Sequence, residues 1–269
     1  MKTMHELVAA IVAAQAGCAP LEPASLKELT RAAYDALRAV REEEQAQAAA
    51  LAGSLAASGD AVDALLCEVA DEVAGLNIDK VCAAWPAEQR KLAELAALAP
   101  GSRVIEIGCF MGATTVWLAA MCRRLGKQLI AIDPWDGVQD GSDERVHEIF
   151  RRNTAAYGDV VHVIRAKSGD ALPLLPADCA ATCGLTFVDG MHTYPHVLYD
   201  LRDYWRALMP GGIMVVHDVF EATYHKGINR ALAEFRPMGE VNYLRYGPGQ
   251  EEMRQYRHGP CGLAWFRKE

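Results

Sequence analysis

The chain has 269 residues, of which 51% are hydrophobic and 23% are charged, and this balance predicts a soluble globular protein with a sizeable core. A formal net charge of −8, without a long run of Lys or Arg, argues against a protein that binds duplex nucleic acid. No apolar stretch reaches the roughly 20 residues of a membrane-spanning helix. The first residues make a poor secretory signal, and the eight cysteines include no C-x-x-C pair. We therefore expect a cytoplasmic protein with free thiols and no membrane partner.

Residues 1–97 carry apolar side chains at the three- and four-residue spacing that is typical of amphipathic helices. Ser25 and Glu28 form a capping box at the start of the second of these helices. The apolar faces need a covering surface, which either the same chain or a second copy could supply. We interpret the segment as a helical N-terminal extension, acting as a lid or an oligomer contact, and expect a homo-oligomer. Its four helices have apolar positions within residues 7–12, 26–40, 62–73 and 92–98.

From Gly101 onward, short apolar runs alternate with helical segments, which is typical of a parallel sheet covered by helices. We expect residues 98–269 to form a Rossmann-like, doubly wound α/β domain whose seven-stranded sheet ends in an antiparallel hairpin. The predicted strands are 103–107, 128–132, 160–165, 185–188, 212–216, 241–246 and 261–266. The predicted helices lie near 113–125, 143–157, 170–175, 195–208 and 226–235.

The first predicted strand leads into the turn E-I-G-C-F-M-G, in which Gly108 and Gly112 precede a helix. Glycine lets a backbone approach a ligand closely, and the start of a helix supplies free N–H groups. A nucleotide-like cofactor is therefore expected at the carboxyl end of this strand. Glu106 would repel a pyrophosphate but suits a cationic ligand, and Asp133, after the second strand, can bind ribose hydroxyls. This combination indicates S-adenosylmethionine (SAM) rather than a dinucleotide.

Acidic and histidine side chains follow the fourth and fifth predicted strands. Asp189 and His192 stand in D-G-M-H after the fourth strand, and His217 and Asp218 follow the fifth. Because both strand ends face the ligand crevice of an open α/β sheet, we expect these side chains to converge. Carboxylates favour Mg²⁺ or Ca²⁺, whereas histidine ligation favours a transition metal. We therefore predict a divalent-cation site of Asp189, His217 and Asp218, with His192 as the general base.

Several motifs resemble those of the Rossmann-class SAM-dependent methyltransferases over about residues 86–266. They are E-I-G-C-F-M-G, I-D-P-W, F-V-D-G-M-H-T-Y, Y-D-L-R-D-Y-W, M-P-G-G-I-M-V-V-H-D and G-I-N-R-A-L-A-E-F. The succession is most similar to the metal-dependent branch that includes macrolide-sugar O-methyltransferases of the macrocin and mycinamicin type. The resemblance implies O-methylation of a small hydroxylated metabolite, of sugar or natural-product type, with Mg²⁺ or another divalent cation as a cofactor.

The resemblance also implies roles for individual residues. Asp189 and Asp218 match metal-binding carboxylates, and His192 matches a general base. His217 departs from the pattern, because the metal-dependent relatives usually place an acid there. Ser168, in K-S-G-D after the third strand, matches a residue that holds the adenine. The predicted SAM site comprises Glu106, Gly108, Cys109, Phe110, Gly112, Thr114, Asp133, Pro134, Trp135, Ser168 and Asp189.

Other functions remain open at the level of the sequence. A metal-independent N-methyltransferase would need only proton removal and positioning of an amine acceptor. The fold also supports hydroxylases and proteins that bind SAM without transferring its methyl group. Activity that resists EDTA would favour the N-methyltransferase. A protein that binds SAM but forms no S-adenosylhomocysteine with any acceptor would favour the binding role.

Overall fold

The computed structural model describes residues 31, 35, 59–78, 84–136, 143–220, 226–235, 240–244 and 261–269. The chain divides into two compact units, residues 1–47 and 48–269, and the second contains every described strand. Apart from Arg31 and Asp35, which are helical, the helices predicted within residues 7–12 and 26–40 lie outside the described residues. In the described part of the chain, no helix has the length and apolar character that crossing a membrane requires.

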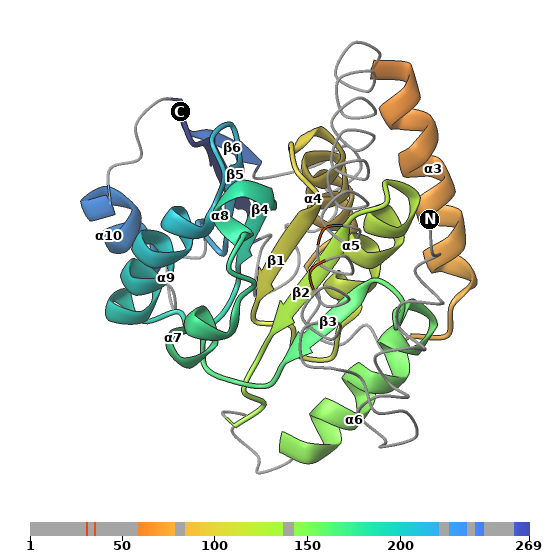
Figure 1. Cartoon of the computed structure of the whole chain (residues 1–269), viewed down its shortest axis with the longest axis horizontal. Helices are drawn as coiled ribbons and strands as arrows, with labels where there is room; N and C mark the ends of the chain where they lie inside the picture. Colours follow the sequence, from red (N-terminus) through yellow and green to blue (C-terminus); the bar gives the residue numbers. More distant parts are fainter. Residues whose placement is uncertain are drawn as a thin grey trace. The chain divides into compact units, whose positions relative to one another are not determined.

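A seven-stranded mixed sheet forms the centre of the second unit, with the strand order β3-β2-β1-β4-β5-β7-β6 (Figure 1). The strands β1 to β5 run parallel, whereas β7 pairs antiparallel with both β5 and β6. The predicted Rossmann-like sheet with its antiparallel hairpin is therefore confirmed. The strands are β1 Arg103–Ile107, β2 Gln128–Ile132, β3 Val161–Ile164, β4 Cys183–Val188, β5 Ile213–His217, β6 Asn242–Leu244 and β7 Leu263–Arg267.

Helices cover both faces of this sheet because neighbouring residues of each buried strand point to opposite sides. Val104 packs in a cluster with α3, α4 and α5, whereas Ile105 packs in a second cluster with α9 and α10. Figure 1 shows these two groups of helices on either side of the sheet. The helices are α3 Gly59–Gly75, α4 Pro86–Leu98, α5 Ala113–Arg124, α6 Asp143–Thr154, α7 Ser168–Ala171, α8 Cys179–Thr182, α9 Tyr194–Ala207 and α10 Lys226–Phe235.

Two boundaries differ from the sequence prediction for reasons of backbone chemistry. The helix predicted at 170–175 is the short α7 followed by a 3₁₀ turn, Leu172–Leu174. Pro173 lacks the N–H group that a continuing α-helix would need. The last strand begins at Leu263 rather than Cys261, because Gly262 adopts a left-handed φ of 77° before it.

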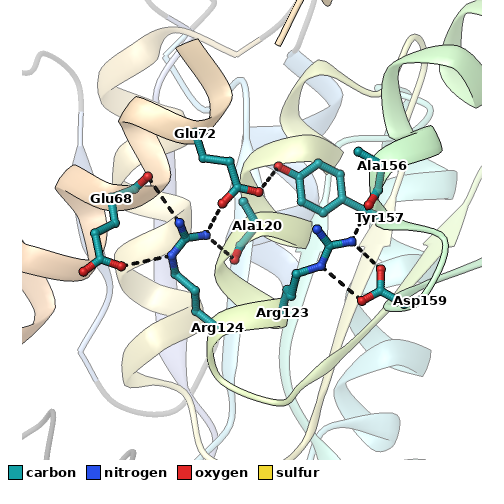
Figure 2. A network of polar contacts seen from close by, with 8 residues as sticks. All are labelled: Glu68, Glu72, Ala120, Arg123, Arg124, Ala156, Tyr157 and Asp159. Carbon is teal, nitrogen blue, oxygen red and sulfur yellow. Dashed lines mark hydrogen bonds and ion pairs between the residues drawn. The ribbon is translucent and has the colours of Figure 1, made fainter. Parts of the chain in front are cut away.

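Polar contacts as well as apolar packing hold α3 against α5 (Figure 2). The guanidinium of Arg124 bonds to the carboxylates of Glu68 and Glu72 on α3. The buried Tyr157 donates its hydroxyl hydrogen to Glu72 Oε1 at 2.6 Å. Arg123, the neighbour of Arg124, instead pairs with Asp159 on the surface. The helix α3 thus shares the core of the sheet domain, while a domain boundary between residues 97 and 98 stays a prediction.

Candidate active site

The backbone is strained at the carboxyl ends of three parallel strands. Among the described non-glycine residues, a left-handed φ occurs at Phe110 after β1, at Trp135 after β2 and at Asp218 after β5, with values of 45°, 49° and 62°. Such conformations persist only where the surrounding structure enforces them, and they concentrate at functional sites. The strain marks the sheet edge at which the sequence predicts the cofactor and the acidic cluster.

The glycine turn after β1 brings two strand ends into close contact. Gly108 has a φ of 86°, and a Cβ atom added there would lie 2.0 Å from the backbone oxygen of Asp189. The N–H of Gly108 donates to Ile132 O at 2.9 Å, and the N–H of Asp189 donates to Ile107 O at 2.8 Å. Glycine is therefore required at position 108, because any side chain would separate the ends of β1 and β4.

The carboxylate of Asp133 organises this turn. Its Oδ2 atom accepts hydrogen bonds from the N–H groups of Cys109 and Phe110, both at 2.9 Å. Its Oδ1 atom accepts from the N–H of Trp135 at 2.7 Å. Burial raises the pKa of Asp133, although these three bonds favour its ionised form. The structure thus shows Asp133 holding the glycine turn, and its predicted contact with the ribose stays a prediction.

Trp135 supports the same loop from the side of α6. Its indole N–H donates to Phe110 O at 2.8 Å, and only 2% of the residue is exposed. Its ring centroid lies 4.4 Å from that of His147 and 4.8 Å from that of Phe150. Trp135 is packed into a small apolar cluster, and the expectation that it belongs to the SAM site stays untested.

The carboxylate of Glu106 is fully buried inside the sheet, and neither of its oxygen atoms has a hydrogen-bond partner. Burial raises the pKa of Glu106 to about 8. The neighbouring side chains of Thr115 and Cys109 favour the ionised form, but burial outweighs them, so a positively charged ligand nearby would stabilise the carboxylate. The buried position of Glu106 is therefore the feature of the structure that best supports a positively charged ligand near the end of β1.

The remaining predicted cofactor residues lie around these strand ends. Ser168 begins α7 and is half-buried, and its carbonyl accepts the hydroxyl hydrogen of Tyr204 at 2.8 Å. Cys109 is buried, and burial raises the pKa of its thiol well above the usual value, so it is a poor nucleophile. Thr114 lies in the first turn of α5, after Gly112, and Pro134 lies half-buried in the loop after β2.

Asp189, His192 and Asp218 converge as the sequence predicts. One ligand atom from each lies within 4.8 Å of those from the other two, a spacing that suits a metal ion. The Nε2 atom of His192 is 3.0 Å from Asp218 Oδ2 and 3.6 Å from Asp189 Oδ1. Burial lowers the pKa of His192, but the two carboxylates outweigh burial and raise it to about 9.

His217 also lies against Asp189 and Asp218, as the sequence predicts, with its Nδ1 atom 3.4 Å from Asp218 Oδ1. Its Nδ1 atom lies 3.1 Å from Asp189 Oδ1, and its Nε2 atom lies 3.2 Å from Glu88 Oε2. Both ring nitrogens therefore face carboxylates, and the compact group of possible ligands contains His192 instead. Direct metal ligation by His217 stays a prediction. Sequence reasoning missed Glu88, which comes from α4 and is 1% exposed.

Comparisons with known proteins show which domain family and which folds the chain resembles. Residues 105–219 match the family model described as a methyltransferase domain. The fold resembles a putative O-methyltransferase from Klebsiella pneumoniae, with 18% identity over 76% of this chain and 90% of that one, and a TM-score of 0.52. It also resembles the O-methyltransferase TomG from Streptomyces achromogenes, solved in complex with SAM, at 18% identity over 76% and 90% of the two chains, with a TM-score of 0.53.

A third similar structure is the cofactor-bound protein Rv0187 from MTB, at 20% identity over 76% of this chain and 88% of that one, with a TM-score of 0.53. No curated protein sequence matches the chain. At such identities the structural likeness establishes the fold, and the family match adds the type of domain. The family match over residues 105–219 supports a methyltransferase.

Proposed function

We propose that the protein transfers the methyl group of SAM to a hydroxyl group of a small metabolite, with a divalent cation and a histidine base. The observation that carries the proposal is the convergence of Asp189, His192 and Asp218 beside the glycine turn. Two of the similar structures are described as O-methyltransferases, which favours an oxygen acceptor. An acceptor of sugar or natural-product type rests on the sequence motifs that resemble the macrocin and mycinamicin branch.

The chain offers SAM a site with a negative charge balance. When bound, SAM supplies a methyl group on a positively charged sulfur. The carboxylate of Asp189 would offset positive charge on the ligand, and the same charge would favour the ionised form of Glu106, whose pKa burial raises to about 8. The loop from Gly108 to Gly112, held by Asp133, would carry the cofactor at the end of β1. Ser168, at the start of α7, would contact the adenine.

A divalent cation fits the two converging carboxylates. Asp189 and Asp218 offer carboxylate oxygens, and His217 would offer an imidazole nitrogen, so that His192 can act as the base. A cation held there would lower the pKa of an acceptor hydroxyl and so increase its nucleophilicity. Asp189 and Asp218 raise the pKa of His192 and so keep a proton on its ring. A cation bound to these carboxylates would neutralise part of their charge and lower the pKa of His192.

His192 would receive the acceptor proton at its imidazole. Its side chain is 35% exposed, whereas that of Asp218 behind it is 7% exposed, so His192 is the accessible member of the pair. Asp218 would hold the ring in place through the 3.0 Å contact with Nε2. Holding the acceptor and the methyl donor together would remove a large entropic barrier to the transfer.

The test is calorimetric titration of EDTA-treated protein with SAM, with and without Mg²⁺, followed by a screen of hydroxylated acceptors for S-adenosylhomocysteine formation. Micromolar SAM binding and acceptor-dependent, Mg²⁺-dependent S-adenosylhomocysteine would support the proposal. The absence of any SAM binding would overturn it.

A metal-independent transferase is a second candidate, because one specific observation favours it. His192 and His217 already place imidazole groups against Asp189 and Asp218, so those carboxylates have counter-charges within the protein. Turnover that is unchanged by EDTA, together with no heat of Mg²⁺ binding, would select this candidate over the metal-dependent one.

A further inference from the structure

Glu88 is a buried acid outside the segment that matches the methyltransferase family. It lies on α4, Pro86–Leu98, whereas the family match begins at residue 105. Only 1% of the residue is exposed. Burying a carboxylate is costly unless hydrogen bonds and opposite charge compensate for it, so its surroundings must satisfy both oxygens.

Both oxygens of Glu88 are indeed engaged, and by three different parts of the chain. Oε1 accepts a hydrogen bond from the N–H of Gly262 at 2.7 Å, just before β7. Oε2 accepts from the N–H of Trp85 at 2.8 Å and lies 3.2 Å from Nε2 of His217, at the end of β5. The bond from Trp85 caps the first turn of α4, because the N3 carboxylate accepts from the N–H of the N-cap residue, and it explains one bond only. Of the other two contacts, the one with His217 links the carboxylate to the candidate active site.

The ring of His217 lies between Glu88 and Asp189 and contacts both carboxylates. The imidazole is 7% exposed, lies edge-on to Phe187 with ring centroids 6.0 Å apart, and points Nδ1 at Asp189 Oδ1 from 3.1 Å. Both ring nitrogens of His217 thus lie within hydrogen-bonding distance of a carboxylate oxygen, one from Glu88 and one from Asp189. Glu88, His217 and Asp189 therefore form a continuous chain of hydrogen bonds from α4 into the acidic cluster.

We propose that Glu88 is a positioning residue of the methyl-transfer site, which fixes the imidazole of His217 and through it the carboxylate of Asp189. The inference rests on the proposed function, and it makes α4 a part of the active site rather than a cover over the sheet. Residues that orient metal ligands from behind commonly change metal affinity or activity by about 10- to 100-fold when they are replaced. An effect of this size is expected from Glu88→Gln, which keeps the shape of the side chain and removes its charge.

The experiment uses full-length protein with ¹⁵N-labelled histidine at pH 7, and His217→Asn to assign the ring signals of His217. The wild type should show both ring N–H signals of His217, because the ring is buried between two acceptors. Glu88→Gln should lose or strongly shift the Nε2–H signal and should bind Mn²⁺ about 10- to 100-fold more weakly. Its affinity for SAM should stay within about twofold, because Glu88 lies behind the acidic cluster rather than at the glycine turn.

The matched control is Glu94→Gln on the same helix, where Glu94 pairs with Lys91 at 2.6 Å on a more exposed face. It should leave the signals of His217 and the affinity for Mn²⁺ unchanged. If Glu88→Gln does not fold, Glu88→Asp replaces it, because the shorter acid keeps its charge but withdraws from His217. A folded Glu88 variant with wild-type His217 signals would overturn the inference. If the wild type transfers no methyl group, the proposed function fails, whereas the ring signals still decide whether Glu88 orients His217.

Discussion

The Nε2 atom of His192 lies 3.0 Å from the Oδ2 atom of Asp218, so the segments that follow β4 and β5 meet through an ion pair. Asp218 is held there by a strained backbone with a φ of 62°. Burial alone would raise the pKa of Asp218, but His192 and His217 hold it below its usual value. Asp218 is therefore an ionised group against which His192 is oriented.

His192→Ala should lower turnover about 10²- to 10⁴-fold, which is the usual contribution of a general base. The affinity for SAM should change little, because His192 follows β4, whereas the glycine turn follows β1 and is held by Asp133. Turnover is measured as S-adenosylhomocysteine formed with the acceptor from the screen, and SAM affinity is measured by calorimetry. His162→Ala, at an exposed position on β3, is the control. Near-normal turnover of His192→Ala would remove His192 from the proton transfer.

Asp189→Ala should abolish the heat of Mg²⁺ binding, because it removes one of the two carboxylates that converge there. Asp218→Asn should weaken binding as well, since an amide oxygen is a poorer ligand for a hard cation than a carboxylate. Both measurements use EDTA-treated protein at pH 7. Asp203→Ala, at a residue of α9 that bonds to Arg206, is the control for the loss of an acid. Equal Mg²⁺ heats in all three variants would rule out this metal site.

The strands and the glycine turn could be predicted because their residues carry local signals. Arg103–Ile107 and Gln128–Ile132 are short apolar runs, and both have the predicted bounds. Gly108 marks a turn in which no side chain fits. The convergence of Asp189 and Asp218 followed from topology, because both stand at the carboxyl ends of neighbouring parallel strands.

The partners of the predicted residues could not be read from the sequence. Glu88 is 129 positions from His217 and occupies an ordinary polar position in a helix. Trp135 follows Asp133 in a loop, and nothing local shows that its ring packs against α6. These contacts depend on how helices dock on the sheet, which is a tertiary property that no spacing rule encodes.

Glu106 should make the folded protein less stable as the pH rises. Its pKa is raised from 4.5 to about 8 on folding, so between these values the folded state keeps a proton that the unfolded state has lost. The free energy of unfolding should therefore fall by up to about 1.4 kcal/mol per pH unit through this window and level off above it. The free energy of unfolding of Glu106→Gln should not show this fall with pH.

The measurement is urea unfolding of wild type and Glu106→Gln between pH 5 and about 8.5, which brackets the window of the Glu106 titration. The variant should gain stability over the wild type as the pH rises, because it has no carboxyl group to ionise inside the sheet. Glu148→Gln, at an exposed position on α6, controls for the loss of an acid elsewhere. A difference between wild type and Glu106→Gln that is constant across this range would show that Glu106 does not titrate as proposed.

Tyr157→Phe should destabilise the protein by about 0.5–1.5 kcal/mol, because it removes the hydrogen bond that joins the 3₁₀ turn Ala155–Tyr157 to Glu72 on α3. Glu72→Ala should cost more, since it also removes a carboxylate partner of Arg124 (Figure 2). Asp159→Ala breaks only an exposed pair with Arg123 and should cost at most about 1 kcal/mol. If Glu72 holds α3 in the sheet domain, urea unfolding should show the largest loss of stability for Glu72→Ala. An equal loss in Glu72→Ala and Asp159→Ala would show that apolar packing by Val62, Leu66, Val69 and Val73 is sufficient to hold α3.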